Sequence, residues 1–137
     1  MTLVLDSSVT LAWIYADEVT PAVEQVFERI ADTQAWVPAI WPAEVANGLQ
    51  AGVRRGRIDT EFRDAALADL AVRAIVTDAD TNMYVWTTTT RLATRFGLTI
   101  YDSLYLELAQ RRSLPLASLD RELCAVAKLL RIEVLGT

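Results

Sequence analysis

Short apolar segments alternate along the chain with longer segments in which apolar residues recur every three or four positions. The short segments are brief and bounded by turn residues, so they predict buried strands, whereas the longer segments have the periodicity of amphipathic helices. The predicted strands lie at residues 2–5, 36–38, 74–76, 116–118 and 132–135. Because strands that alternate with helices form βαβ units, the sequence predicts an α/β fold. We expect a parallel central sheet of four to five strands with helices on both faces.

Capping and stop residues mark the ends of the predicted helices. Thr20 followed by Pro21 is typical of a helix start, and Gly56 and Gly97 are typical helix stops. The threonine run 87–90 forms helix poorly, although it lies inside a segment that is otherwise helical. The predicted helices begin near Ser8, Pro21, Pro42, Asp59, Asp80, Tyr101 and Asp120. The helix after Asp59 is expected to bury a face made of Phe62, Ala66, Leu67 and Leu70.

The composition is that of an ordinary globular protein, with 53% hydrophobic and 23% charged residues. The length of 137 residues suits one domain, residues 1–137, with one sizeable core. No uncharged apolar stretch is long enough for a membrane span, and no basic segment of a signal peptide precedes the apolar run that Asp6 interrupts. The single cysteine, Cys124, fits a reducing compartment. We therefore expect a cytoplasmic location and no membrane partner.

The formal net charge of −5 argues against a protein that coats nucleic acid through bulk positive charge. It leaves room for an enzyme that binds nucleic acid locally. Arginines cluster at Arg54, Arg55 and Arg57 and again at Arg111 and Arg112. Arginine suits bidentate contacts with phosphate, but cations are also favoured at helix C-termini on dipole grounds alone.

Four acidic residues lie inside apolar runs, where a carboxylate is costly unless it is paired or binds a cation. The chain has no histidine and one cysteine, so imidazole and thiolate metal sites are not available. Carboxylates are the ligands that Mg²⁺ and Mn²⁺ prefer, so these ions are the expected cofactors. The four acids are Asp6, Glu44, Asp102 and Asp120.

These acids follow predicted strands or begin predicted helices, so they are expected to converge. In a parallel sheet with right-handed crossovers, all strand C-termini lie at one edge, and ligands bind there where the strand order reverses. Several carboxylates in one small cleft require divalent cations to balance their charge. Such a site would hydrolyse a phosphodiester with a metal-activated water.

A purely structural interpretation of the same acids stays open. Asp6, Asp102 and Asp120 are each good N-caps, worth about 1 kcal/mol apiece, and Glu44 gains from the helix dipole. A capping residue does not need apolar residues on both sides of it in the sequence, however. Most other acids of the chain lie in polar surroundings, so the apolar flanks of these four favour a ligand role. Residues that could support the acids are Ser7, Asn47 and Ser118, with Glu122 as a possible fifth acid.

Four segments of the chain resemble the motifs of a known family. They are Val4-Leu5-Asp6-Ser7-Ser8, Pro42-Ala43-Glu44-Val45-Ala46-Asn47, the helix start Tyr101-Asp102-Ser103-Leu104-Tyr105, and Leu116-Ala117-Ser118-Leu119-Asp120. The family is that of the PIN-domain ribonucleases, and the VapC toxins of type II toxin–antitoxin pairs are the nearest group. The likeness extends from the first strand to the last helix.

The resemblance implies an endoribonuclease that depends on Mg²⁺ or Mn²⁺, with Asp6, Glu44, Asp102 and Asp120 as its acidic site. Asp6, Asp102 and Asp120 would be the direct metal ligands, and Glu44 would act through water. VapC toxins form homodimers and are silenced by a cognate antitoxin that inserts a segment near the active site. The expected partners are therefore RNA, an antitoxin and a second copy of the chain. The family sometimes has a further acid after the last motif, and here only Glu122 is near that position. The resemblance therefore does not decide whether the site holds one metal ion or two.

Three other functions are compatible with the residues. A phosphohydrolase of the haloacid dehalogenase type also places an Asp after its first strand, but that chemistry needs a second Asp where this chain has Ser8. A non-catalytic interaction module and a housekeeping nuclease could use the same fold. The sequence does not identify the RNA target or the bond that is cut.

Overall fold

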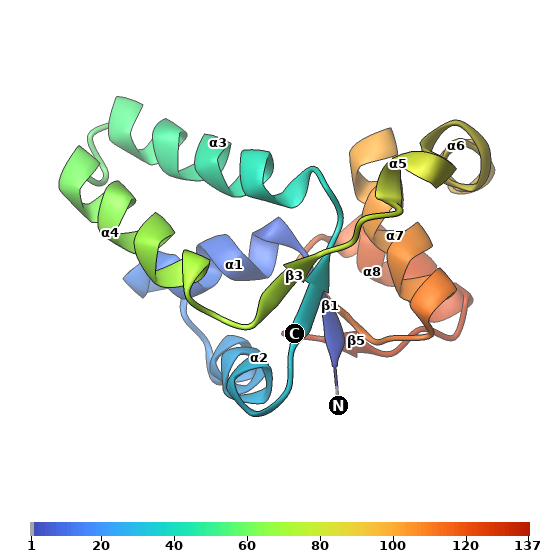
Figure 1. Cartoon of the computed structure of the whole chain (residues 1–137), viewed down its shortest axis with the longest axis horizontal. Coiled ribbons are helices and arrows are strands. Elements are labelled where there is room, and N and C mark those ends of the chain that lie inside the picture. The colour runs from blue at the N-terminus through green and yellow to red at the C-terminus, as the bar shows by residue number, and fades with distance from the viewer. Residues whose placement is uncertain (1) are drawn as a thin grey trace.

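Five short parallel strands form the centre of the computed structural model, which describes residues 2–137 (Figure 1). Their order in the sheet is β3-β2-β1-β4-β5. The strands are β1 (Leu3–Leu5), β2 (Ala35–Val37), β3 (Ile75–Thr77), β4 (Leu116–Ala117) and β5 (Val134–Leu135). Each lies within two residues of its predicted position, and every pairing is parallel. The predicted α/β fold class is therefore confirmed.

The helices cover both faces of the sheet. Helices α1 (Ser7–Ile14), α2 (Pro21–Asp32), α3 (Trp41–Arg54) and α4 (Thr60–Ala71) lie on one side of the strands in Figure 1. The later helices, including α7 (Ile100–Arg112) and α8 (Arg121–Leu129), lie on the other side. Because both faces are covered, Leu3, Val4 and Leu5 of the central strand are all fully buried although their side chains alternate between faces. No helix within residues 2–137 has the length and apolar character needed to cross a membrane.

Several predicted helix ends are confirmed by their caps. The Thr20 hydroxyl accepts a hydrogen bond from the Val23 amide at 3.2 Å, and Pro21 occupies the first turn of α2. The Asp59 carboxylate accepts one from the Phe62 amide at 2.8 Å at the start of α4. Gly97 ends α6 (Thr90–Phe96) with a φ of 67°, a left-handed conformation that glycine adopts without strain.

The helix predicted to run from residue 80 toward residue 96 is present over residues 81–96, but a regular α-helix throughout that range is wrong. That segment contains α5 (Thr81–Tyr84), a π-helical turn η2 (Val85–Thr89) and then α6. The Thr90 hydroxyl donates a hydrogen bond to the Val85 carbonyl at 2.6 Å, so threonine side chains compete with the backbone for partners here. The β-branched run therefore widens the helix.

The predicted burial of Phe62 is also wrong, because 45% of this residue is exposed. Helices α3 and α4 form a hairpin that extends away from the sheet, and Phe62 lies in the first turn of α4 near the end of that hairpin (Figure 1). Leu70 lies in the last turn of α4 and is buried, whereas Ala66 and Leu67 are partly buried against the core. Helical periodicity identifies the apolar face but not how far the core extends along it.

A buried ion-pair network holds the C-terminal end of α7 against the loop after β3. The Asp78 side chain is fully buried and accepts hydrogen bonds from Arg111 at 2.7 Å and Arg112 at 2.8 Å. Arg111 also pairs with buried Glu107 at 2.8 Å. Burial alone would raise the pKa of Asp78, but the hydrogen bonds from Arg111, Arg112 and Thr81 outweigh it and hold that pKa at about 2. Two acids and two arginines therefore balance one another.

We predict that Asp78→Ala lowers the free energy of unfolding by about 3 kcal/mol, because it leaves two partly buried guanidinium groups without their shared partner. Urea denaturation monitored by circular dichroism measures the change. Asp69→Ala is the control, because Asp69 pairs with Arg73 at an exposed site and its loss should cost less than about 1 kcal/mol. Equal losses in the two variants would contradict the assignment of Asp78 as the centre of this network.

Candidate active site

The sheet topology brings the ends of β1 and β4 together. These strands are neighbours, and the strand order reverses between them because β1 leads to β2 on one side while β4 leads to β5 on the other. Asp6 directly follows β1, Ser118 directly follows β4, and Asp120 lies two residues further on, at the start of α8. This is the crevice at which open α/β sheets bind ligands.

The Asp6 side chain is held at this crevice by hydroxyl groups. Only 4% of Asp6 is exposed, and its Oδ2 accepts hydrogen bonds from the hydroxyls of Ser8 at 2.6 Å and Ser118 at 2.7 Å. The same hydroxyls accept bonds from the Leu119 amide at 2.9 Å and the Asp120 amide at 3.1 Å. Asp6 is the N-cap residue of α1, but its side chain makes no capping bond. Its carboxylate is therefore directed to this network rather than to helix capping.

Two supporting residues at Asp6 were not identified from the sequence. Ser8, rather than Ser7, makes the short bond to Asp6, since the Ser7 hydroxyl is 3.5 Å from Oδ1. The Thr10 hydroxyl donates to the Asp6 carbonyl at 3.2 Å and accepts from the indole N–H of Trp41 at 3.1 Å. Both hydroxyls lie within one helical turn of Asp6, and that spacing is the signal that could have identified them.

Glu44 lies in the first turn of α3 and receives a hydrogen bond from the Tyr105 hydroxyl of α7. Tyr105 is fully buried, and its pKa is raised by burial and by the negative charges of Asp6 and Glu44. The phenol therefore stays neutral and donates a hydrogen bond to the carboxylate. Tyr105 was not singled out from the sequence, because its position in an apolar helical run resembles that of a core residue.

Asp102 and Asp120 differ in their relation to helix capping. The predicted N-cap role of Asp102 is wrong: Thr99 caps α7, accepting a hydrogen bond from the Asp102 amide at 3.1 Å. The carboxylate of Asp102 is half-buried, and its pKa is raised to about 6 by burial and then by the charges of Asp120 and Asp6. Asp120 does cap α8, because its Oδ1 accepts a hydrogen bond from the Leu123 amide at 2.9 Å.

The four acids affect one another electrostatically. Burial raises the pKa of Asp6 against the hydrogen bonds of Ser8 and Ser118, and the charges of Glu44 and Asp120 raise it further. Burial likewise raises the pKa of Glu44; the hydrogen bond from Tyr105 opposes this rise, and the charge of Asp102 adds to it. Within residues 2–137, none of the four forms an ion pair with an arginine or lysine. The crevice therefore carries negative charge that no cationic side chain among the described residues balances through an ion pair.

This donor set fits a divalent cation in its chemistry. The oxygens are carboxylates, and the raised pKa values of Asp6, Glu44 and Asp102 reflect burial and mutual repulsion that a cation would offset. In the part of the chain that the structure describes, no three acidic, thiol or imidazole side chains are already arranged to share one metal ion.

Three of the arginines considered for phosphate contact have partners elsewhere. Arg57 pairs with Asp17 at 2.7 Å and with Glu18 at 2.8 Å, and it stacks over the Tyr15 ring at 3.8 Å. Arg111 and Arg112 bind Asp78, as described above. Arg54 and Arg55 are exposed at the end of α3.

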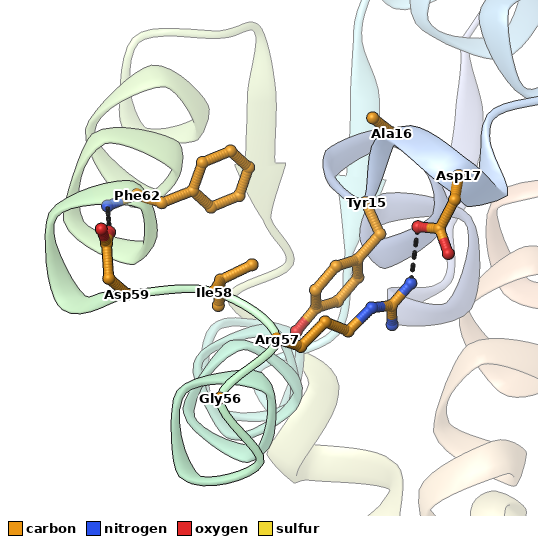
Figure 2. A pocket seen from close by; sticks show the side chains of 8 residues that line it. All are labelled: Tyr15, Ala16, Asp17, Gly56, Arg57, Ile58, Asp59 and Phe62. Carbon is orange, nitrogen blue, oxygen red and sulfur yellow. Dashed lines mark hydrogen bonds and ion pairs between the residues drawn. The ribbon is translucent and has the colours of Figure 1, made fainter.

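A large cavity of the protein lies away from the four candidate acids. It has a volume of about 820 Å³ and lies between the 3₁₀ turn η1 (Ala16–Glu18) and the connection from α3 to α4 (Figure 2). Figure 2 shows the Arg57 guanidinium directed at Asp17 beside the Tyr15 ring, with Phe62 and Ile58 on the opposite side. A smaller pocket of about 280 Å³ includes Glu44 and the exposed Asn47.

Comparison with known proteins identifies the fold family. The family model of the PIN domain matches residues 3–129. PAE2754 from Pyrobaculum aerophilum is 22% identical with a TM-score of 0.67, covering 91% of this chain and 84% of that one. VapBC2 from Rickettsia felis, bound to a DNA fragment from its promoter, is 16% identical with a TM-score of 0.66, covering 98% and 97% of the two chains.

A toxin–antitoxin complex from Klebsiella pneumoniae is also similar, at 17% identity with a TM-score of 0.57, covering 86% of each chain. A search of curated protein sequences finds no match. At these identities, the solved structures establish a common fold. The match of the family model covers all four acids of the candidate site.

We predict that the metal-free protein loses stability as pH rises from about 4 to about 6. The raised pKa of Asp102 means that the folded state binds its proton more tightly than the unfolded state, so ionisation in this range favours unfolding. Asp102→Asn should therefore raise the melting temperature at pH 7 and leave it unchanged near pH 4. Thermal unfolding followed by circular dichroism at both pH values measures this.

Added Mg²⁺ should raise the melting temperature of the wild type at pH 7 more than that of Asp102→Asn, because the ion offsets the charge that the substitution removes. Glu28→Gln, which changes the formal charge equally at an exposed position of α2, should have neither effect. A melting temperature of Asp102→Asn at or below that of the wild type at pH 7 would show that Asp102 is not under electrostatic strain.

Proposed function

This chain belongs to the PIN-domain family, and we propose that it is a divalent-metal-dependent endoribonuclease with an active site at Asp6, Glu44, Asp102 and Asp120. PIN domains are nuclease domains. Because the chain belongs to this family, it is not a phosphohydrolase of the haloacid dehalogenase type. The observation that carries the proposal is the electrostatic coupling of the four acids at the sheet crevice, where no cationic side chain of residues 2–137 pairs with any of them. We treat residues 1–137 as a single catalytic domain.

In this proposal, Asp6, Asp102 and Asp120 hold Mg²⁺ or Mn²⁺. When bound, the cation acts as a Lewis acid that lowers the pKa of water and stabilises negative charge on the phosphodiester. Ser8 and Ser118 fix the Asp6 carboxylate, so that its orientation does not have to be established when substrate binds. Asp120 uses Oδ1 as a helix cap and keeps Oδ2 available.

Glu44 acts through water, and Tyr105 positions it. The Tyr105 hydroxyl donates to Oε1 of Glu44, and Ser7 also hydrogen-bonds this side chain. A carboxylate has about four acceptor positions, so others remain to accept a proton or a hydrogen bond from water. Hydrolysis adds the oxygen of that water to phosphorus and breaks the bond between phosphorus and the leaving nucleoside oxygen. Burial raises the pKa of Glu44, which makes its carboxylate a better proton acceptor than an ordinary glutamate.

We propose that a cognate antitoxin protein inhibits this nuclease. Two of the similar structures are toxin–antitoxin proteins, and VapBC2 from Rickettsia felis matches over 97% of its chain. A toxin nuclease needs such an inhibitor, because uncontrolled cleavage of cellular RNA would harm the cell that makes it. The homodimer and the cytoplasmic location stay predictions.

We predict that the purified protein cleaves RNA only when Mg²⁺ or Mn²⁺ is present. Asp6→Asn and Asp102→Asn should each lower the rate more than about 100-fold, because each removes a proposed ligand of the ion, and loss of a mere supporting group costs 10–100-fold. Gel electrophoresis of labelled RNA measures the rate. The Glu28→Gln variant should cleave as the wild type does. Full activity in both aspartate variants, or activity that survives EDTA, would refute the mechanism.

We predict that Tyr105→Phe lowers cleavage about 10- to 100-fold at pH 7, because it removes the hydrogen bond that holds Glu44. That bond also lowers the pKa of Glu44, so its loss should move the acidic limb of the pH–rate profile to higher pH. A purely structural defect would reduce the rate at every pH without moving the limb. The pH dependence of kcat distinguishes these outcomes.

A further inference from the structure

A shallow pocket of about 280 Å³ lies beside the acidic site, and of its lining residues only Glu44 has a role in the mechanism proposed above. It is formed where the first turn of α3 approaches the first turn of α7. Glu44 is shared between the pocket and the active site, and Tyr101 immediately precedes Asp102. The lining residues are Ile40, Ala43, Glu44, Asn47 and Tyr101. An RNA strand at the acids would therefore pass next to this pocket.

Tyr101 has no evident role in folding. It is 58% exposed, whereas the residues that follow from Ser103 to Ala109 are all buried. Its hydroxyl has no hydrogen-bond partner among the described residues. An aromatic ring left open to solvent at the edge of a site is the usual platform for stacking a nucleobase.

The rest of the lining favours an uncharged planar group over a phosphate. No arginine or lysine lines the pocket, and Glu44 would repel an anion. Ile40, Ala43 and the Tyr101 ring provide apolar surface, and the exposed Asn47 amide offers both a donor and an acceptor. This combination matches a base, which has two apolar faces and a hydrogen-bonding edge.

We infer that this pocket receives one unstacked nucleobase of single-stranded RNA, next to the phosphodiester that is cleaved. Tyr101 stacks on the face of the base, and Asn47 binds its edge. The inference rests on the proposed nuclease function and adds the substrate class, because a base paired within a duplex cannot leave its stack to enter the pocket without a further cost. It also reassigns Asn47 from support of the acids to contact with substrate.

The test compares a short oligoadenylate with an abasic ribose-phosphate oligomer of the same length and charge. Binding is measured by fluorescence anisotropy with Mg²⁺ in the Asp6→Asn background, which prevents cleavage. Tyr101→Ala should weaken oligoadenylate binding about tenfold, the loss expected for one base–aromatic stack, and should leave the weak binding of the abasic oligomer unchanged. Tyr101→Phe should bind as the parent does, because the ring is retained.

Phe62→Ala is the matched control, because Phe62 is also an exposed aromatic residue but lines the larger cavity at the end of the α3–α4 hairpin. It should change binding of neither oligomer. In the active protein, Tyr101→Ala should raise the KM for single-stranded RNA with little change in kcat. Asn47→Ala should reduce any preference between oligoadenylate and oligouridylate.

The outcomes separate the two proposals. If the wild type cleaves RNA and Tyr101→Ala retains its KM and its preference for the oligomer with bases, the base pocket is refuted and the nuclease function stands. An equal loss of binding for the abasic oligomer would likewise refute base stacking. If the wild type cleaves no RNA with Mg²⁺ or Mn²⁺, the nuclease function fails whatever the binding data show.

Discussion

The arrangement of this site depends on one buried carboxylate, Asp6, at the end of the central strand. Burying it is costly, and the structure offsets part of that cost with hydroxyl donors from Ser8 on its own helix and Ser118 on the neighbouring β4 connection. Because Ser118 in turn accepts a bond from the Asp120 amide, the position of Asp6 determines how the α8 cap approaches the crevice. No cationic side chain of residues 2–137 pairs with the remaining negative charge. Burial of that charge destabilises the metal-free site, and a bound metal ion would offset this cost.

Helix α7 connects this strained site to the most firmly paired charges of the protein. Its first turn carries Asp102, its centre carries Tyr105, and its last turn holds the arginines that bind Asp78. The two ends have opposite electrostatics: burial and like charges raise the pKa of Asp102, whereas two guanidinium groups lower that of Asp78. The paired end can therefore hold the helix in place while the unpaired end keeps its charge for a ligand. This is the expected balance between stability and function, in which strain at a site is offset elsewhere in the fold.

The fold and the placement of Asp6 and Asp120 at one edge of the sheet could be predicted because they follow from short-range patterns and from sheet topology, whereas a metal site shared by all four acids stays a prediction. Asp6 and Asp120 each follow a parallel strand, and parallel strands end at one edge, so their proximity did not depend on side-chain detail. The depth of the core under α4 could not be predicted in this way, since the exposure of Phe62 depends on tertiary packing. The threonine run indicates a weak helix from its sequence, but not that the chain would form a π turn there. Tyr105 shows the same limit, because a polar atom on a fully buried residue gives no signal of its partner 61 positions away.

Asp120 and Asp102 show that an N-cap role and a metal-ligand role are not alternatives for an acidic residue. Asp120 caps α8 with one oxygen and contributes charge to the crevice as well, so a cap role does not argue against a ligand role. Asp102 would be expected to cap α7 by residue type, yet Thr99 does so and frees the carboxylate. A carboxylate has two oxygens with about four acceptor positions, and one backbone amide uses only one of them. A capping bond therefore does not decide whether such a residue is a ligand. The better indicator is negative charge that lies near other acids and has no cationic partner within residues 2–137.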